Sequence, residues 1–259
     1  MIEMIDSHAH YDDEAFLEDQ NELLEKVHET IEYIINSSSS FETIKTTLEL
    51  TKNYSYIYGV LGIHPNESQE LSESRFEELR TYYQNDKIVA VGEIGLDYYW
   101  KEPEREIQKK WFEKQFMLAK ELNLPVVIHS RDAAKDTLDY LKSMKTPDAL
   151  GEIHCFSYGK DMAREFLNLG YYLGIGGVIT FQNAKTLKEV VEYVPLDRIL
   201  LETDCPYLAP NPYRGKRNSS LYLPFVVEEI AKIKQVSYEE VVSVTTQNAL
   251  QLFRIQSKK

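Results

Sequence analysis

The sequence is poor in cysteine, glycine and proline, and it has no long uninterrupted apolar run. Two cysteines among 259 residues exclude a disulfide-stabilised scaffold, and 11 glycines with 9 prolines exclude a low-complexity chain. No stretch approaches the ~18 apolar residues of a membrane span, and the N-terminus lacks the basic and apolar regions of a secretory signal. These absences predict a cytoplasmic protein without a membrane segment.

Basic residues are also scarce, with 29 Lys and Arg against 42 Asp and Glu, for a net charge of −13. Such a surface does not coat nucleic acid indiscriminately, because that requires a basic face. A local basic site remains compatible with this charge. The composition is otherwise that of an ordinary globular protein, with 43% hydrophobic and 27% charged residues. The chain is long enough to bury a large core.

Eight short apolar runs recur along the chain, and amphipathic stretches separate them. Their nearly continuous apolar character predicts buried parallel strands rather than strands with one exposed face. Eight units in 259 residues give about 32 residues each, close to the ~30 of a strand–helix–strand unit. The expected strands are Met4–His8, Tyr33–Ser37, Tyr56–Ile63, Ile88–Ile94, Pro125–His129, Gly151–Phe156, Tyr171–Ile175 and Ile199–Thr203.

Helices are expected between these strands. The spacing of apolar residues predicts helices over Glu14–Thr30 and Glu104–Leu122, and Ser237 with Glu240 has the spacing of a helix-capping box. The pattern predicts one domain over residues 1–259, a (β/α)8 TIM barrel with an additional C-terminal helix. An open doubly wound sheet is the alternative. Neither a GxGxxG motif nor a P-loop follows a strand, so no nucleotide cofactor is expected.

Five of the six histidines lie at the ends of expected strands. The carboxyl ends of barrel strands meet at one mouth, where active sites of such barrels lie, so these side chains are expected to converge. The imidazoles of His8 and His10 are two residues apart, so a strand points both to the same side and both can reach one metal ion. The five are His8, His10, His64, His129 and His154.

Two carboxylates end apolar runs in the same way, Glu93 in VGEIGLDY and Asp204 in LLETDCPY. Together with four of the imidazoles they suit zinc, manganese or similar divalent ions. This set exceeds what one tetrahedral site needs, so two ions that share a bridging carboxylate are expected. The expected ligands are His8, His10, Glu93, His129, His154 and Asp204.

Strand alternation also makes a prediction about three acidic residues and the two cysteines. The acidic residues two positions before three of the ligands should face the barrel interior as well, unless the register slips near the mouth. Buried carboxylates are costly unless paired, so at least one should accept a hydrogen bond from a ligand histidine. By the same parity, Cys155 and Cys205 should point outward, buried under the helices. The three acidic residues are Asp6, Glu152 and Glu202.

These stretches resemble the TatD-type metal-dependent deoxyribonucleases, a family of amidohydrolase-like barrels. The matching segments follow one another in family order to about Asn218. Tyr158 departs from the family, which more often has a small residue there, and so do Ser219 and Ser220, where an acidic residue and a proline are common. The segments are IDSHAHYD, GVLGIHP, VGEIGLDYYW, LPVVIHSRDA, IHCFSYG, GGVITFQNA and LLETDCPYLAPNPYRGKRN.

The resemblance implies a divalent-metal phosphodiesterase that trims DNA in the manner of an exonuclease. We expect a water activated by the ions to attack phosphorus, and a single-stranded or frayed end as the substrate, because metals at a barrel mouth lie below the loop rim. Two ions per chain are implied, with zinc, manganese, magnesium and nickel as the candidates. Related amidohydrolases often bridge their metals with a modified lysine, but no lysine lies at a matching strand end here. The implied roles are one ion on His8 and His10 with Asp204 nearby, the other on His129 and His154, and Glu93 as the bridge.

Asp204 is expected to orient the attacking water and take its proton, because it follows the eighth strand. Just beyond it, the RGKR segment offers arginine forks that suit phosphate oxygens, although a solvated surface loop is the alternative. The aromatic run Tyr98, Tyr99 and Trp100 can stack on an unpaired base or pack under a lid. The expected substrate contacts are His64, Arg131, Arg214, Lys216 and Arg217.

Two other functions fit the same residues. A barrel with these metals can hydrolyse amides or lactones or deaminate nucleobases, and the RGKR segment is what favours phosphate. A binding or quality-control component that keeps metal with little chemistry is the second alternative, against which the complete ligand set argues. DNA and RNA are not distinguished, because no residue can be assigned to a 2′-hydroxyl.

Overall fold

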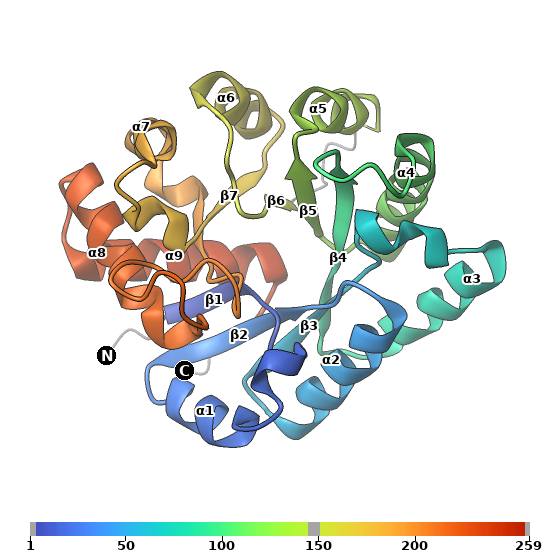
Figure 1. The fold of residues 1–259 in the computed structure, drawn as a ribbon, viewed down its shortest axis with the longest axis horizontal. Helices are drawn as coiled ribbons and strands as arrows, with labels where there is room; N and C mark the ends of the chain where they lie inside the picture. The colour runs from blue at the N-terminus through green and yellow to red at the C-terminus, as the bar shows by residue number, and fades with distance from the viewer. Residues whose placement is uncertain (1–3, 145–150, 257–259) are drawn as a thin grey trace.

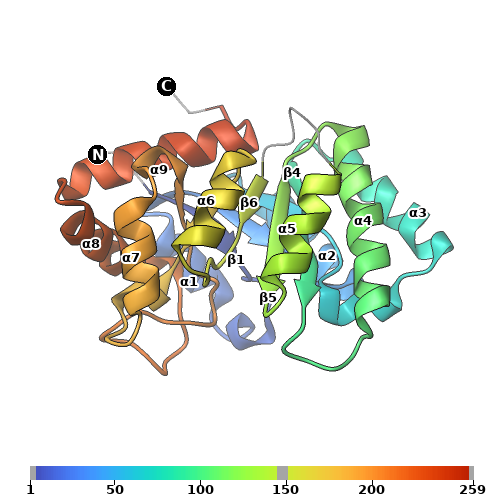
Figure 2. The same cartoon turned by 90° about the horizontal axis from the view of Figure 1, so that it is seen from above.

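The computed structural model describes residues 4–144 and 151–256 (Figure 1). Eight parallel strands form one sheet in the order of the chain, and helices surround it as a (β/α)8 barrel (Figures 1 and 2). The strands are β1 (Met4–Ala9), β2 (Ile31–Ser37), β3 (Ile57–Leu61), β4 (Ile88–Asp97), β5 (Val126–Arg131), β6 (Gly151–Ile153), β7 (Tyr172–Ile175) and β8 (Ile199–Leu201).

The barrel closes between β1 and the chain just beyond β8. The backbone amide of His10 donates to the carbonyl of Cys205 over 2.8 Å, and the amide of Asp204 donates to the carbonyl of His8 over 2.9 Å. Strands that follow one another in the chain are also neighbours in the sheet. A doubly wound sheet reverses its strand order, so the open-sheet alternative is wrong.

Helices and short 3-10 turns connect the strands. Within the described part of the chain, no helix is long and apolar enough to cross a membrane. The α-helices are α1 (Gln20–Val27), α2 (Phe41–Asn53), α3 (Glu73–Thr81), α4 (Arg105–Leu122), α5 (Ala134–Ser143), α6 (Lys160–Asn168), α7 (Lys185–Tyr193), α8 (Leu223–Lys234) and α9 (Tyr238–Phe253), and the 3-10 turns are η1 (Glu14–Phe16), η2 (Pro65–Glu70), η3 (Tyr82–Gln84), η4 (Gly177–Thr180), η5 (Leu196–Arg198) and η6 (Ser220–Tyr222).

All eight expected strands are present, and the apolar runs that predicted them are buried. Every residue of β4 is buried, as expected for a strand covered on both faces. This strand runs to Asp97, three residues further than expected. Gly95 permits this, because its φ is +146° and a Cβ there would lie 2.0 Å from the carbonyl oxygen of His129 on β5. A residue without a side chain therefore lets β4 and β5 approach closely.

The single helix expected over Glu14–Thr30 is wrong in its first half, where the chain forms η1, a break and then α1. The carboxylate of Asp13 caps η1 by accepting from the amide of Ala15 over 2.8 Å. Such local capping competes with helix continuation, and Leu17 in the break is 73% exposed. The helix expected over Glu104–Leu122 is confirmed as α4.

The additional C-terminal helix is confirmed as α9, capped by Ser237 as predicted. This helix lies at the amino ends of the strands, because the side chain of Asn248 donates to the carbonyls of Leu196 and Ile199. Figure 2 shows α9 on one side of the barrel and the loops that follow the strands on the opposite side. The carboxyl ends of the strands are therefore the end that stays open for a site.

Candidate metal centre

A pocket of about 780 Å³ opens at the carboxyl ends of the strands. All six of the expected metal ligands except His8 line it, and His8 is buried beneath it. A second hollow of similar volume lies between α3 and α4 and is lined mainly by lysine, arginine and glutamate side chains. The chemistry-bearing residues therefore gather at the barrel mouth rather than at the outer hollow.

Three groups of candidate ligand atoms meet in this pocket, and the atoms of each group lie within 4.8 Å of one another. Two of the groups share Glu93, and two share His8. The predicted convergence of strand-end side chains is therefore present in the structure. The groups are His8, His10 and Asp204; His8, Glu93 and His154; and His64, Glu93 and His129.

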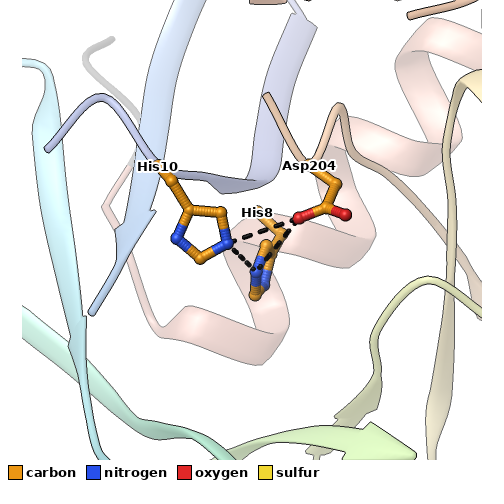
Figure 3. Close-up of side chains that lie close together, drawn as sticks. All are labelled: His8, His10 and Asp204. Carbon is orange, nitrogen blue, oxygen red and sulfur yellow. Dashed lines mark hydrogen bonds and ion pairs between the residues drawn. The ribbon is translucent and has the colours of Figure 1, made fainter. Parts of the chain in front are cut away.

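In the first group, two imidazole nitrogens and one carboxylate oxygen face one another (Figure 3). The Nε2 atoms of His8 and His10 are 3.1 Å apart, and Oδ1 of Asp204 lies 3.3 Å from the Nε2 of His10. Asp204 has a φ of +56°, a left-handed conformation that aspartate adopts more readily than most residues. This turn aims its carboxylate at the histidines, while its second oxygen points away from them (Figure 3).

Glu93 lies at the centre of the site and faces histidines with both carboxylate oxygens. Its Oε2 is 3.4 Å from the Nε2 of His8 and 3.7 Å from the Nε2 of His10. Its Oε1 is 2.6 Å from the Nδ1 of His129 and 3.1 Å from the Nε2 of His154. Each oxygen thus faces different imidazoles, which is the arrangement that a bridging carboxylate requires.

Ser37 at the end of β2 orients the first two histidines. The Nδ1–H of His10 donates to the backbone carbonyl of Ser37 over 2.7 Å. The Nδ1 of His8 lies 3.3 Å from the hydroxyl of the same serine. In a neutral imidazole only one nitrogen carries hydrogen, so once His10 is deprotonated this contact leaves its Nε2 lone pair facing the centre of the site.

Carboxylates hold the outer nitrogens of the other two expected ligands. Oδ2 of Asp97 lies 3.2 Å from the Nε2 of His129, and Oε2 of Glu202 lies 3.4 Å from the Nδ1 of His154. Such outer partners fix the ring orientation of ligand histidines. Glu202 is thus the interior carboxylate that lies at ion-pair distance from a candidate ligand histidine, but the two atoms do not meet hydrogen-bond geometry, so the predicted hydrogen bond itself is not formed.

Asp97 is a site residue that the sequence analysis missed. It lies four residues after Glu93 in VGEIGLDY, so strand alternation points both side chains to the same side. This spacing could have identified Asp97 as a site residue. It did not, because the expected strand ended at Ile94, before Asp97.

Burial of the three interior carboxyls is also confirmed, since Asp6, Glu152 and Glu202 are fully buried. Asp6 accepts hydrogen bonds from the hydroxyls of Thr203 and Ser220, both over 2.6 Å. Burial raises the pKa of Asp6 to about 7, and these hydrogen bonds oppose it only in part. Ser220, which departs from the family pattern, thus supports the interior below the site.

Glu152 and Glu202 lie together under His154. Burial and the charge of Glu202 raise the pKa of Glu152 well above its usual value, and the hydroxyl of Ser7 donates to Glu152 over 2.9 Å. Gly174 makes room for the pair, because a Cβ there would lie 2.2 Å from Oε2 of Glu202 and 2.7 Å from Oε1 of Glu152. The shared burial of the two carboxyls therefore favours the protonated form of Glu152.

The ligand carboxylates are ionised despite their burial. Burial alone would raise the pKa of Glu93, but His154, His64 and His129 outweigh it and hold the pKa well below its usual value. Burial would likewise raise the pKa of Asp204, but the hydrogen bond from His10 outweighs it and lowers this pKa. Ionised carboxylates among imidazoles are the donor set that divalent ions of the zinc and manganese type prefer.

His64 turns a nitrogen that carries hydrogen, rather than a lone pair, toward the centre of the site. Its Nδ1 accepts the backbone N–H of Asn66 over 3.1 Å, so the neutral ring carries its hydrogen on Nε2. That nitrogen lies 3.6 Å from Oε1 of Glu93. Burial and His129 lower the pKa of His64 to about 3, which keeps the ring neutral. The ring of His64 therefore presents an N–H donor to the pocket, which is what the expected contact with a substrate oxygen requires.

The basic residues expected to contact substrate are placed differently from one another. Arg131 lines the pocket, and its guanidinium lies 3.9 Å from the ring centroid of Tyr99. Arg217 instead forms a two-pronged ion pair with Asp19, over 2.7 and 2.6 Å. Among the described residues that line the pocket, none comes from residues 214–217. Arg214 lies over the ring of Phe181, and Lys216 over that of Tyr213.

The prediction for Cys155 is wrong. Its side chain is partly exposed and lines the mouth pocket, because β6 already ends at Ile153 and Cys155 has a φ of +45°. Strand parity does not extend through such a turn. Cys205 is fully buried within the core as expected, and both cysteines are free.

Comparison with known proteins agrees with this geometry. A family model described as TatD related DNase matches residues 5–254. The chain is 42% identical to the uncharacterized metal-dependent hydrolase YabD of Bacillus subtilis, over 97% of this chain and 99% of that protein. It is 35% identical to the uncharacterized metal-dependent hydrolase YcfH of Escherichia coli K12, over 99% and 97% of the two chains. The crystal structure of YjjV, a TatD homolog from Escherichia coli K12, superposes with a TM-score of 0.93 at 32% identity, over 99% and 100%. The chain therefore belongs to the TatD related DNase family.

Proposed function

We propose that this protein is a metal-dependent hydrolase that uses two divalent ions to cleave phosphodiester bonds in DNA. The observation that carries this proposal is the position of Glu93, whose two oxygens face two separate pairs of histidines in the mouth pocket. The names of the relatives, which are metal-dependent hydrolases, support the metal. The family description supports the nuclease activity.

The donor atoms fit two ions. We assign one ion to His8, His10 and Asp204, which form one group, and the other to His129 and His154, which both face Oε1 of Glu93. Glu93 would serve both ions. Mixed nitrogen and oxygen donors favour zinc, manganese or nickel over magnesium, which prefers oxygen. When bound, such ions neutralise phosphate charge and acidify a water in the site.

The charge of the pocket gives a reason why an anionic substrate needs these ions. Six carboxylate residues line the pocket, against Arg131 as the one lysine or arginine among the described lining residues. This negative charge repels a phosphodiester, and two divalent ions would offset most of it, which lowers the cost of binding the phosphate.

Asp204 accepts the proton of the attacking water in this proposal. One of its oxygens faces the histidines, and the other points away from them (Figure 3). Its side chain is 17% exposed, so the second oxygen reaches the pocket. A carboxylate held ionised in this position can orient the water and take its proton.

His64 and Arg131 bind the phosphate. The Nε2–H of His64 faces the pocket as a neutral donor, and the Arg131 guanidinium offers a fork that fits phosphate oxygens. A single-stranded or frayed end suits this recessed site, because the scissile phosphate must reach ligands that lie at or below the pocket floor.

The experiment that tests the function is reconstitution. The protein is stripped of metal with a chelator, reloaded with zinc, manganese, magnesium or nickel, and assayed on end-labelled single-stranded DNA, duplex DNA and RNA. Cyclic amides and lactones are assayed in parallel. We expect metal-restored cleavage of DNA, with single strands preferred. Turnover of an amide or lactone without cleavage of any phosphodiester would overturn the proposal.

A further inference from the structure

Exposed aromatic side chains gather at the barrel mouth. Of the large apolar side chains that are exposed in residues 4–144 and 151–256, half lie after β4 or β8 around the pocket. Tyr99 and Trp100 are each 55% exposed, and Tyr207 is 53% exposed. Trp100, Tyr207 and Leu208 line the pocket itself. Apolar surface left in water beside a polar pocket is typical of a ligand-binding rim.

Tyr99 and Trp100 form the first wall, after β4. Their ring centroids are 4.9 Å apart at an interplanar angle of 87°, and the guanidinium of Arg131 covers the ring of Tyr99. The amide of Tyr99 donates to Oδ1 of Asp97 over 3.0 Å. Because Asp97 also holds His129, this wall is tied to the second set of ligands. The hydroxyl of Tyr98, by contrast, donates a hydrogen bond to the carboxylate of Asp136.

Tyr207 and Leu208 form the second wall, after β8. The hydroxyl of Tyr207 donates to Oδ2 of Asp13 over 2.7 Å, and its amide donates to the carbonyl of Asp204 over 2.9 Å. Its ring centroid lies 6.4 Å from that of His10. The hydroxyl is therefore engaged, the ring remains half exposed, and this wall is tied to the first set of ligands.

The two walls follow strands on opposite sides of the barrel and border one pocket. In a closed ring of eight strands in chain order, β4 and β8 lie on opposite sides, and Figure 1 shows β4 across the barrel from the chain that follows β8. Glu93, His10, His129 and His154 line the same pocket as Trp100, Tyr207 and Leu208. A ligand that uses both walls has a planar group on each side of a central anion.

We propose that the mouth contains two base-binding subsites, one on Tyr99 and Trp100 and the other on Tyr207 and Leu208, with the scissile phosphate between them. This rests on the proposed phosphodiesterase function. The substrate class is an internucleotide linkage whose flanking bases are both unstacked, since the faces of a base in a duplex are covered by its neighbours. Stacking on an aromatic side chain tolerates any base, so little sequence preference is expected.

The test uses the dinucleotide dT-p-dT and two analogues in which a tetrahydrofuran abasic residue replaces one nucleoside. Removal of either base should lower kcat/KM of the wild type by about 5- to 100-fold. Trp100→Ala should abolish the preference for dT-p-dT over the analogue that lacks the base at one end of the linkage. Tyr207→Ala should abolish the preference over the analogue that lacks the base at the other end. Tyr207→Phe keeps the ring, and Tyr193→Ala removes an exposed aromatic of α7 outside the pocket. Both should preserve the discrimination at both ends.

Equal losses on all three substrates in the Trp100→Ala and Tyr207→Ala variants would overturn the subsites and assign the walls a structural role. Binding gives a second readout that does not depend on catalysis. Trp100 is exposed, whereas the other tryptophan, Trp111, is buried. The dinucleotide should quench the tryptophan fluorescence of the wild type but not that of Trp100→Phe, which retains only the buried Trp111. Quenching without hydrolysis would contradict the proposed function alone, and hydrolysis without quenching would contradict the first subsite alone.

Discussion

The side-chain amide of Gln108 pairs with both the backbone N–H and the backbone carbonyl of Asp97, over 2.9 and 3.0 Å. Gln115, seven residues later on the same face of α4, makes the same two contacts to Ile63, the residue before His64. Both glutamine side chains are buried. One helix therefore positions the strand ends that carry a partner of His129 and the neutral donor His64.

Gln108→Leu should destabilise the protein and weaken metal binding. The substitution leaves the buried amide and carbonyl of Asp97 without their partner, which costs about 1–3 kcal/mol. Denaturant unfolding and metal titration measure the two effects. Gln20→Leu, which removes a hydrogen bond to Tyr11 near the surface, is the control. An unchanged free energy of unfolding would show that Asp97 finds other partners.

Glu93→Gln should reduce the metal content from two ions to one or none. The substitution keeps the size of the side chain but removes the charge that serves both histidine pairs. Metal analysis after dialysis measures the stoichiometry. Glu67→Gln, which also lines the pocket but belongs to none of the three ligand groups, should retain both ions. A Glu93→Gln protein with two ions and full activity would end the bridging proposal.

Asp204→Asn should lower the rate more than the metal content. Loss of a general base typically costs about 10²- to 10⁴-fold in rate, whereas the amide oxygen can still face His10. Single-turnover cleavage of end-labelled DNA, with metal analysis of the same sample, separates the two quantities. A loss of less than about tenfold with metal retained would rule out Asp204 as the base.

His64→Ala and His129→Ala should have different effects on the metal content. Because the Nε2 of His64 carries hydrogen, its loss should leave both ions in place and cost a phosphate donor, about 10²- to 10³-fold in kcat. His129→Ala should instead lose an ion. Metal analysis of the two variants compares them, and loss of an ion from His64→Ala would make this histidine a ligand.

Metal affinity should rise with pH between about 6 and 9. Burial would lower the pKa of His10, but its hydrogen bond to Asp204 outweighs burial and raises the pKa to about 9 in the metal-free site. An ion must displace that proton, so each unit of pH should strengthen binding by up to about tenfold. Without metal, the same raised pKa stabilises the fold below pH 6.5, and this contribution is lost as the pH rises through 9. Calorimetry in buffers of different ionisation enthalpy measures the released proton, and its absence would contradict the prediction.

The barrel and the convergence of its candidate ligands were predictable because both follow from local pattern. Buried parallel strands read as apolar runs, and a parallel barrel gathers all its strand ends at one mouth. His8 and Glu93 could thus be placed together although 85 positions separate them. The break after η1 was missed because capping by Asp13 interrupts an apolar periodicity that otherwise fits a helix.

Contacts that depend on loop paths were not predictable from pattern. The RGKR segment favours phosphate binding by composition, yet Arg217 is held by Asp19 through an ion pair between distant loops. Cys155 faces the pocket because its backbone leaves the strand conformation, which alternation cannot reveal. The two walls of aromatic side chains also come from loops after β4 and β8, so only their first half, after β4, was visible in the sequence.

The candidate centre draws on the first strand of the barrel and on the turn after the last one. His8 and His10 emerge from the ribosome early, whereas Asp204 is made only when most of the polypeptide exists. The full set of candidate donors comes together only when the chain after the last strand pairs with the first strand. Metal binding should therefore be coupled to closure of the barrel, so that a bound ion would stabilise the closed fold.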